Sequence, residues 1–199
     1  MPSFIKHTIN KNDFILSSNK VVFWEQEKIL ILSDLHLGKS GHFRKSGIAV
    51  PHAVMKEDMQ RLVTAIQFFK PELVVIVGDL FHSVANKEHE LFLKWRNDLQ
   101  HISILLVKGN HDIVPGEWYV NANIITAEKY WRRNNFLFVH HIDDVAKDDI
   151  NDGDYFFSGH IHPAVSIKGL GKQSLRFPCF YFTKQYAVLP AFGKFTGTY

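Results

Sequence analysis

Side chains that can bind a metal ion recur along this chain, each shortly after a run of apolar residues. Carboxylate and amide oxygens occur together with imidazole nitrogens, and no thiolate takes part. Such a donor set suits Mn²⁺, Fe or Zn²⁺ better than Ca²⁺. We therefore predict a site for two divalent metal ions, with Mn²⁺ as the first choice. The residues are Asp34 and His36, Asp79, Asn110 and His111, a histidine at position 140 or 141, and His160 and His162.

The spacing within two of these groups predicts how they reach a common site. Asp34 and His36 are two residues apart, as are His160 and His162. On an extended backbone, residues two apart point to the same side, so Asp34 and His36 can bind one ion. His160 and His162 would lie about 6.5–7 Å apart, which suits two ions about 3.5–4 Å apart. Two neighbouring ions need a shared anion, and Asp79 is the predicted bridge. The alternative is that these are separately satisfied polar residues, with Asp79 simply beginning a turn.

Strands and helices alternate over the part of the chain that contains the first groups. Apolar runs at Ile29 to Leu32, Leu73 to Val77 and Ser103 to Val107 are typical of buried strands. Two helical patterns lie between them, one opening at Pro51 and one over Glu88 to Leu99. This order favours parallel strands joined by right-handed crossovers, which brings the polar groups at their carboxyl ends to one edge of the sheet.

The carboxyl-terminal half consists of short apolar runs separated by turn residues, which indicates an antiparallel or mixed sheet. The runs are Tyr130 to Arg132, Phe136 to His140, Tyr155 to Ser158, Val165 to Ile167, Leu175 to Phe177, Tyr181 to Phe182 and Ala187 to Leu189. No linker or internal repeat suggests a boundary, so we expect a single domain over residues 1–199.

Composition narrows the class of protein. With 199 residues, 46% of them hydrophobic, the chain is long enough to bury a substantial core. The net charge of +3 is compatible with a polyanionic substrate without requiring one. The single cysteine, Cys179, excludes a disulfide framework and a cysteine-built zinc site. The sequence contains neither a signal-peptide pattern nor a run of about 20 apolar residues, and we expect a cytoplasmic protein that does not enter a membrane.

The order of the polar motifs resembles the calcineurin-like metallophosphoesterase superfamily. The motifs are Asp34-Leu35-His36, Gly78-Asp79, Gly109-Asn110-His111-Asp112 and Gly159-His160-Ile161-His162. Further segments resemble a narrower group, the ligase-associated DNA-damage-response endonucleases: Asp34 to Lys39, Phe43-Arg44 before Gly47 and Pro51, Gly78 to His82, and Leu189 to Gly193. The resemblance implies an α/β fold, a four-layer α/β/β/α sandwich of two mixed β-sheets flanked by helices, and hydrolysis of phosphate esters at a dinuclear site.

The resemblance also implies which residue binds which ion. It assigns one ion to Asp34, His36 and His162, and the other to Asn110, His160 and the histidine at the end of the strand near position 140, with Asp79 on both. Matching by position favours His140 for that histidine. Periodicity does not choose between His140 and His141, because both faces of Phe136 to Val139 are apolar. His141 is then left to support a ligand or to face the substrate, and His82 is a further candidate for a supporting role.

The remaining polar residues suggest catalytic and substrate-binding roles. We expect His111 to protonate the departing alkoxide, because a general acid has to be held in a fixed direction and Asp112 is available to orient it. Asp112 would equally serve to cap the turn that follows. Asn110 would contact a phosphoryl oxygen as well as its ion. In the loop after the first ligands, Arg44 and Lys39 are candidates for binding a phosphodiester backbone.

Three functions are compatible with these residues. The first is hydrolysis of phosphodiester bonds, with DNA as the substrate, and the resemblance adds DNA ligase, helicase and nuclease repair proteins as functional partners. The second is hydrolysis of small nucleotides or phosphomonoesters, which requires a closed pocket rather than an open groove. The third is a noncatalytic scaffold, against which the pair Asn110 and His111 argues.

Overall fold

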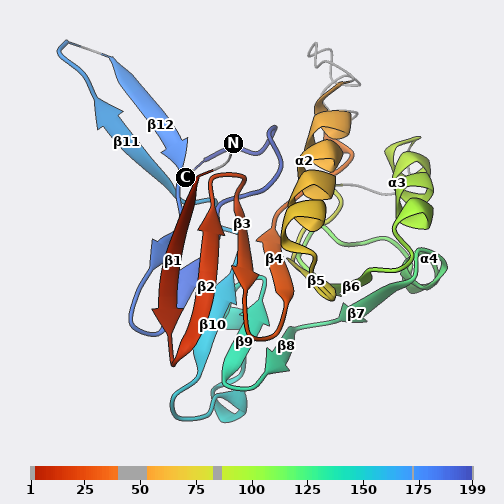
Figure 1. The fold of residues 1–199 in the computed structure, drawn as a ribbon, viewed down its shortest axis with the longest axis horizontal. Coiled ribbons are helices and arrows are strands. Elements are labelled where there is room, and N and C mark those ends of the chain that lie inside the picture. The colour runs from red at the N-terminus through yellow and green to blue at the C-terminus, as the bar shows by residue number, and fades with distance from the viewer. Residues whose placement is uncertain (1–2, 40–52, 83–86, 172, 199) are drawn as a thin grey trace.

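Two β-sheets form the body of the protein (Figure 1). The structure is a computed structural model and describes residues 3–39, 53–82, 87–171 and 173–198. In the larger sheet the strands lie in chain order: β1 (Phe4–Ile9), β2 (Asn12–Ser17), β3 (Val21–Trp24), β4 (Ile29–Ser33), β5 (Leu73–Val77), β6 (Ser103–Val107) and β7 (Ile124–Ala127). Neighbours from β1 to β4 are antiparallel, and neighbours from β4 to β7 are parallel.

The smaller sheet is built by the carboxyl-terminal half. Its order is β13 (Tyr181–Phe182), β14 (Tyr186–Val188), β10 (Tyr155–Ser158), β9 (Phe136–Val139) and β8 (Tyr130–Arg133). The three central strands β14, β10 and β9 are parallel, and the two edge pairings are antiparallel. Both sheets are therefore mixed, and the predicted α/β class with two mixed sheets is confirmed.

Helices cover the outer face of the larger sheet. They are α2 (Ala53–Phe69), α3 (Lys87–Asp98) and the short α4 (Gly116–Asn121). Of the three, only α4 was not predicted from the sequence. Alternate residues of the parallel strands face opposite layers: Val74 and Ile76 pack with the helices, while Val75 and Val77 pack with the smaller sheet. Burial of both faces explains why these strands are continuously apolar. Aromatic rings, among them Phe14, Trp24, Phe136, Phe138 and Phe157, fill the space between the two sheets.

The outer face of the smaller sheet is closed differently. Val145 packs there against Leu137, Val139 and Phe156. Val145 lies between two 3₁₀ turns, η1 (Ile142–Asp144) and η2 (Lys147–Asp149). Among the described residues, this side is thus covered by short turns, whereas α-helices cover the larger sheet.

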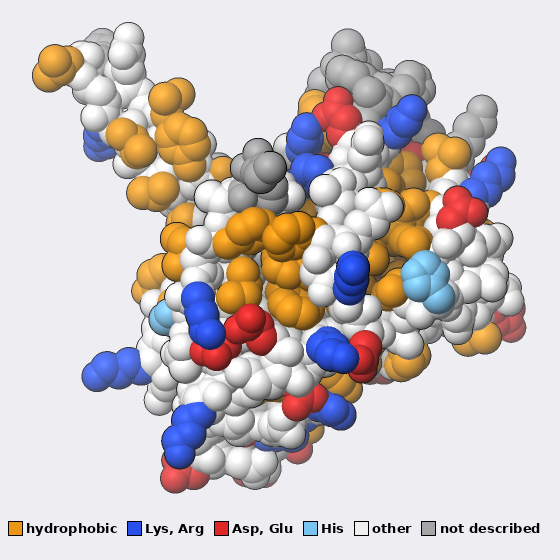
Figure 2. Space-filling view, in the orientation of Figure 1, with side chains coloured by type: hydrophobic (Ala, Val, Ile, Leu, Met, Phe, Trp, Pro, Cys, Tyr) orange, Lys and Arg blue, Asp and Glu red, His pale blue; other side chains and the backbone are white. Residues whose placement is uncertain are grey.

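Two of the predicted strands leave the body. β11 (Ala164–Lys168) and β12 (Ser174–Pro178) pair only with each other and form a hairpin that projects from it (Figure 1). One face of this hairpin presents exposed apolar side chains from positions 165, 167, 175 and 177, and Figure 2 shows apolar atoms along this arm. No helix in the described part of the chain is both long and apolar enough to cross a bilayer.

Arg96 fastens α3 to the strands beside it. Its side chain is 1% exposed, and its guanidinium donates hydrogen bonds to the carbonyls of Leu99, Ile102 and Asn123. These carbonyls lie beyond the end of α3 and just before β6 and β7. One buried cation therefore satisfies three backbone acceptors in two connections.

Replacing Arg96 by leucine should lower the free energy of unfolding by about 2–4 kcal/mol, because three buried carbonyls lose their donors. Urea unfolding followed by circular dichroism measures this loss. The matched control is Arg133→Leu, which removes an ion pair of 2.6 Å with Glu27 in which the Arg133 side chain is 54% exposed and should cost less than about 1 kcal/mol. Equal losses in the two variants would contradict the role given to Arg96.

Candidate metal centre

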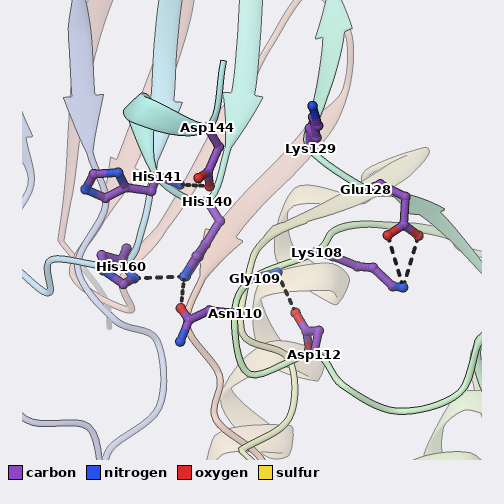
Figure 3. A pocket seen from close by; sticks show the side chains of 10 residues that line it. All are labelled: Lys108, Gly109, Asn110, Asp112, Glu128, Lys129, His140, His141, Asp144 and His160. Atoms are coloured by element: carbon purple, nitrogen blue, oxygen red, sulfur yellow. Dashed lines mark hydrogen bonds and ion pairs between the residues drawn. The ribbon is translucent and has the colours of Figure 1, made fainter. Parts of the chain in front are cut away.

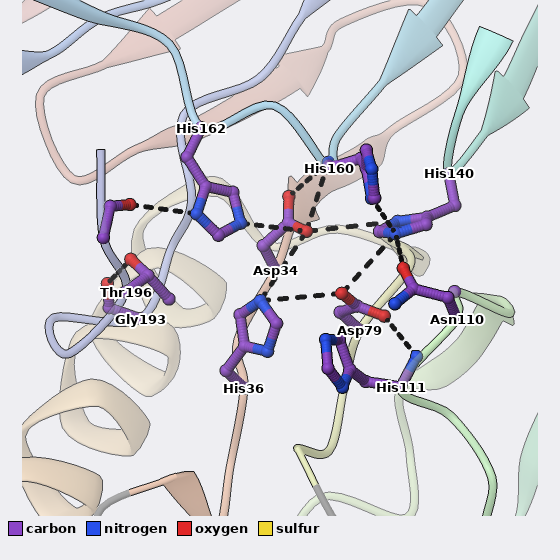
Figure 4. A network of polar contacts seen from close by, with 12 residues as sticks. Asp34, His36, Asp79, Asn110, His111, His140, His160, His162, Gly193 and Thr196 are labelled. Atoms are coloured by element: carbon purple, nitrogen blue, oxygen red, sulfur yellow. Dashed lines mark hydrogen bonds and ion pairs between the residues drawn. The ribbon is translucent and has the colours of Figure 1, made fainter. Parts of the chain in front are cut away.

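The predicted metal-binding side chains converge at one edge of the molecule, where strands of both sheets end (Figure 4). They follow β4, β5 and β6 of the larger sheet and β9 and β10 of the smaller one. Within two sets of three, the ligand atoms lie within 4.8 Å of one another. The sets are Asp34, His36 and His162, and Asp34, Asp79 and His140.

In the first set, nitrogen atoms of two imidazoles face one carboxylate. The Nε2 atom of His162 lies 3.3 Å from Oδ1 of Asp34, and Nε2 of His36 lies 4.0 Å from the same oxygen. His36 Nε2 is also 3.6 Å from Oδ2 of Asp79. Asp79, which was predicted to bind both ions, therefore adjoins the first set.

The second set is centred on His140. Its Nε2 atom lies 3.5 Å from Oδ2 of Asp79 and 3.0 Å from both Oδ1 of Asn110 and Nδ1 of His160. The same Asp79 oxygen thus lies between His36 of the first set and His140 of the second. This arrangement supports the predicted bridging position of Asp79.

The donor atoms fit divalent cations. Both ring nitrogens of His36 are buried and have no hydrogen-bond partner among the described residues, and the same is true of Nδ1 of His140. Such atoms are costly to bury unless a bound group satisfies them. Burial lowers the pKa of His36 to about 2, so its imidazole is neutral, which is the form that binds a metal. Oxygen and imidazole donors together suit Mn²⁺, Fe or Zn²⁺.

The backbone directs these side chains in a way that spacing alone did not predict. Five of the predicted ligands have a left-handed backbone, with φ of 51° at Asp34, 49° at His36, 51° at Asp79, 69° at His160 and 54° at His162. The prediction that the two closely spaced pairs lie on extended strands is therefore wrong, because β4 ends at Ser33 and β10 at Ser158. Turns beyond the strands direct the side chains, and such strained residues cluster at functional sites.

Three glycines make room for the site. A Cβ atom added to Gly78 would lie closer than 3.0 Å to the ring of His140. One added to Gly109 would clash with the Asp79 carboxylate in the same way, and one added to Gly159 with that of Asp34. The absence of a side chain at each position therefore permits the close approach of a predicted ligand.

The segment at residues 189–197, here called the closing segment, ties the two sheets together beside the site. Its backbone amides donate from Leu189 to the carbonyl of Ser158 at 2.8 Å and from Phe192 to that of Ser33 at 2.8 Å. Its Gly197 carbonyl lies 2.9 Å from Nδ1 of His162, which fixes a proton on Nδ1 and leaves Nε2 facing Asp34. In the sequence, Leu189 to Gly193 show only a family resemblance and no sign of this role.

A second residue that supports the site lies on α3, and its role was not predicted from the sequence. The Glu88 carboxylate accepts a hydrogen bond of 2.6 Å from the amide of Gly38, which follows the first two ligands. Glu88 is 8% exposed. Because an acidic residue near the start of a helix usually stabilises the helix itself, its sequence position gave no signal of this contact.

Asp112 is occupied by the backbone. Its two carboxylate oxygens accept hydrogen bonds from the amides of Phe81 at 3.1 Å and Gly109 at 2.9 Å. Both donors precede Asp112 in the sequence, so its carboxylate caps the turn at residues 109–112 and not, as was predicted, the turn that follows. Burial raises the pKa of Asp112 to about 7, although both of these hydrogen bonds lower it.

His111 stands at the edge of the site. Its backbone amide donates a hydrogen bond of 3.0 Å to Oδ1 of Asp79, and its ring packs against those of His36 and His82. The amide thus orients the predicted bridging carboxylate, while the half-buried ring remains beside it (Figure 4).

The other predicted residues are placed as follows. Lys39 is half-buried beside the site, where burial lowers its pKa while the charges of Asp79 and Asp34 raise it. Arg44 lies outside the described residues.

Of the two adjacent histidines, His140 is buried in the site, whereas the side chain of His141 is 35% exposed and caps η1. The structure therefore favours His140 as the ligand.

Replacing Gly159 by alanine should lower the affinity for Mn²⁺ by about 10–100-fold, because the new methyl group displaces the Asp34 carboxylate. Isothermal titration with Mn²⁺ measures the affinity. Gly116→Ala is the control, since a Cβ atom there meets no atom within 4 Å. Unchanged Mn²⁺ affinity in Gly159→Ala would show that Asp34 is not held as described.

Lys20 should make stability depend on pH. Its ammonium donates a hydrogen bond of 2.9 Å to the carbonyl of Ala191 in the closing segment. Burial, helped by the charge of Arg61, lowers its pKa from 10.5 to about 8. Folding therefore disfavours the protonated form, and this penalty is complete below pH 8 and disappears as the pH approaches 10.5.

As the pH rises from 8 to 10.5, the unfolding free energy of the wild type should therefore increase by about 1–2 kcal/mol relative to that of Lys20→Met. This is less than the full pKa shift would give, because the ammonium is only partly buried. Urea unfolding of both proteins at several pH values measures the difference. A difference that stays constant with pH would contradict the lowered pKa.

Comparison with known proteins places this geometry in a family. The family model described as calcineurin-like phosphoesterase matches residues 27–178. The solved structure of Pseudomonas putida nuclease MPE has a TM-score of 0.82 and 24% identity, covering 99% of this chain and 90% of that chain. Yfce, a phosphoesterase from E. coli, has 15% identity and a TM-score of 0.44, covering 81% of this chain and 77% of that one. No curated protein matches. The family model matches most of the length of this chain, and the chain therefore belongs to the calcineurin-like phosphoesterase family.

Proposed function

We propose that this metal-dependent phosphoesterase hydrolyses phosphodiester bonds and that its substrate is DNA. Family membership makes the chain a phosphoester hydrolase. The observation behind the mechanism is the position of one Asp79 oxygen between His36 and His140, at 3.6 and 3.5 Å. That oxygen is shared by two clusters of donor atoms, as a pair of ions requires.

The residues that would hold the ions divide into two groups around Asp79. Asp34, His36 and His162 would bind one ion, and Asn110, His140 and His160 the other. Bound divalent ions supply positive charge to the phosphoryl oxygens and lower the pKa of water. We favour Mn²⁺, which the donor types suit.

The protein's own groups supply orientation and a proton. The amide of His111 fixes the Asp79 carboxylate, and the His111 ring beside it would protonate the departing alkoxide. Asp112 holds the turn that contains Asn110 and His111 by accepting from the amide of Gly109 in the same turn and from that of Phe81 in the loop after β5. The role of Asp112 in catalysis is therefore to position these two residues.

Three observations support DNA over small esters. The cleft beside the site is open to solvent and not a closed pocket. Lys39 adjoins the carboxylates of the site and would meet a phosphate there. The structural neighbour from Pseudomonas putida is named a nuclease. The proposal extends by resemblance to an association with DNA ligase, helicase and nuclease repair proteins, and it includes Arg44 as a contact to the backbone.

His111→Ala should lower turnover of a phosphodiester by about 10²–10⁴-fold, because the leaving group loses its proton donor. Its Mn²⁺ content should remain near that of the wild type, since the amide that holds Asp79 is retained. Turnover of a chromogenic diester and metal analysis of the same preparation measure the two quantities. Loss of both together would contradict the separation of acid and ligand.

The substrate is tested by a panel of esters with Mn²⁺. We expect hydrolysis of a chromogenic diester and of plasmid DNA that exceeds hydrolysis of the matching monoester and of a cyclic nucleotide. Intact plasmid together with hydrolysed small esters would overturn the DNA assignment. Inactivity on all four would favour a noncatalytic scaffold.

A further inference from the structure

A cleft of about 570 Å³ extends from the His140 side of the metal centre (Figure 3). Asn110, His140 and His160 line it at the metal centre, and Figure 3 shows Lys108, Glu128 and Lys129 across the cleft from them. The volume lies in the range of about 300–1,000 Å³ found for small-molecule sites. The cleft therefore has room for roughly one nucleotide beyond the phosphate at the ions, and it ends at two lysines.

Lys108 is held in place by its surroundings. It follows β6 directly, and its backbone amide donates a hydrogen bond of 2.8 Å to the carbonyl of Ala127 at the end of β7. Its ammonium lies 5.6 Å from the ring centroid of Tyr119. The position two residues before Asn110 thus fixes this charge at a set distance from the metal centre.

The partner of Lys108 is easily exchanged. Glu128 lies 3.0 Å from the Lys108 ammonium, but its side chain is 74% exposed whereas that of Lys108 is 20% exposed. An ion pair with one exposed partner contributes little to stability. Glu128 is free to turn into solvent when a phosphate takes its place, and the ammonium remains.

Lys129 adds a second charge at the same end. Its side chain lines the cleft and is exposed, and within the described ranges no carboxylate lies at ion-pair distance from its ammonium. The two other acidic side chains that line the cleft accept hydrogen bonds from backbone amides: Asp144 accepts one of 3.3 Å from His141 in the cap of η1, and Asp112 accepts from Phe81 and Gly109. The far end of the cleft is therefore suited to an anion.

We infer that Lys108 and Lys129 form a subsite for a second phosphate, one nucleotide away from the phosphate that is hydrolysed. This inference rests on the proposed function and names its substrate more closely: a nucleic-acid strand with at least one further phosphate on the His140 side. Lysines act on phosphate through charge without reading bases, so the subsite positions the strand and gives no sequence preference.

The test compares Lys108→Gln/Lys129→Gln with the wild type, and Lys184→Gln serves as a control because Lys184 is exposed and lies outside the cleft. Binding of a short fluorescent single-stranded DNA oligonucleotide is measured by anisotropy at several salt concentrations, with His111→Ala present in every protein to keep the strand intact. The double variant should bind the oligonucleotide about tenfold more weakly at low salt. The slope of the logarithm of the association constant against the logarithm of the salt concentration should decrease in magnitude by about 1–2. The control should match the wild type.

Two further measurements separate this inference from the proposed function. Without the His111 change, kcat/KM for a chromogenic diester should differ by less than about twofold between the double variant and the wild type, because this substrate has one phosphate. A mononucleotide should inhibit both proteins equally. Failure of the wild type to hydrolyse any diester would overturn the proposed function, while the anisotropy result still decides the subsite.

The subsite would be overturned by oligonucleotide affinity and salt dependence that are the same in the double variant and the wild type. Equal weakening of mononucleotide and oligonucleotide binding would overturn it as well, since the lysines would then contact the single phosphate at the metal centre.

Discussion

The fully buried carboxylate of Asp34 is the interaction on which the site depends. It follows β4 of the larger sheet, and both its oxygens accept from the amide of His160, at 3.1 and 3.2 Å, just after β10 of the smaller sheet. A buried charge without partners is strongly unfavourable. The amide of His160 and the imidazole of His162 therefore compensate part of this charge across the two sheets, and a bound cation would compensate the rest.

The rest of the structure keeps that meeting point rigid. The closing segment bonds to the ends of both β4 and β10, Glu88 restrains the loop after the first ligands, and Asp112 restrains the loop of Asn110 and His111. Left-handed residues other than glycine cost up to about 1–3 kcal/mol each. The surrounding hydrogen bonds and packed sheets offset this cost and hold the candidate ligand side chains in place.

The sequence predicted the fold best where a run of apolar residues coincided with a buried parallel strand. Continuous apolar runs identified β5 and β6, and the residues after them identified the site, because parallel strands deliver polar groups at one edge. β7, with its exposed Ile125, and the six-residue α4 gave no such pattern. The extended geometry expected for Asp34 and His36 was wrong because two-residue spacing does not reveal a left-handed turn. The contacts of Glu88 and of the closing segment join positions far apart in sequence and have no local signature.

The glycines at positions 78, 109 and 159 change what counts as the functional unit of this protein. Seven side chains supply the candidate donor atoms, yet each of these glycines lets one of them approach where any Cβ atom would collide. Transplanting the centre into another scaffold would thus require ten residues, three of which have no functional group. A comparison of family members that recorded only the seven would not distinguish a centre able to assemble from one blocked by a single methyl group.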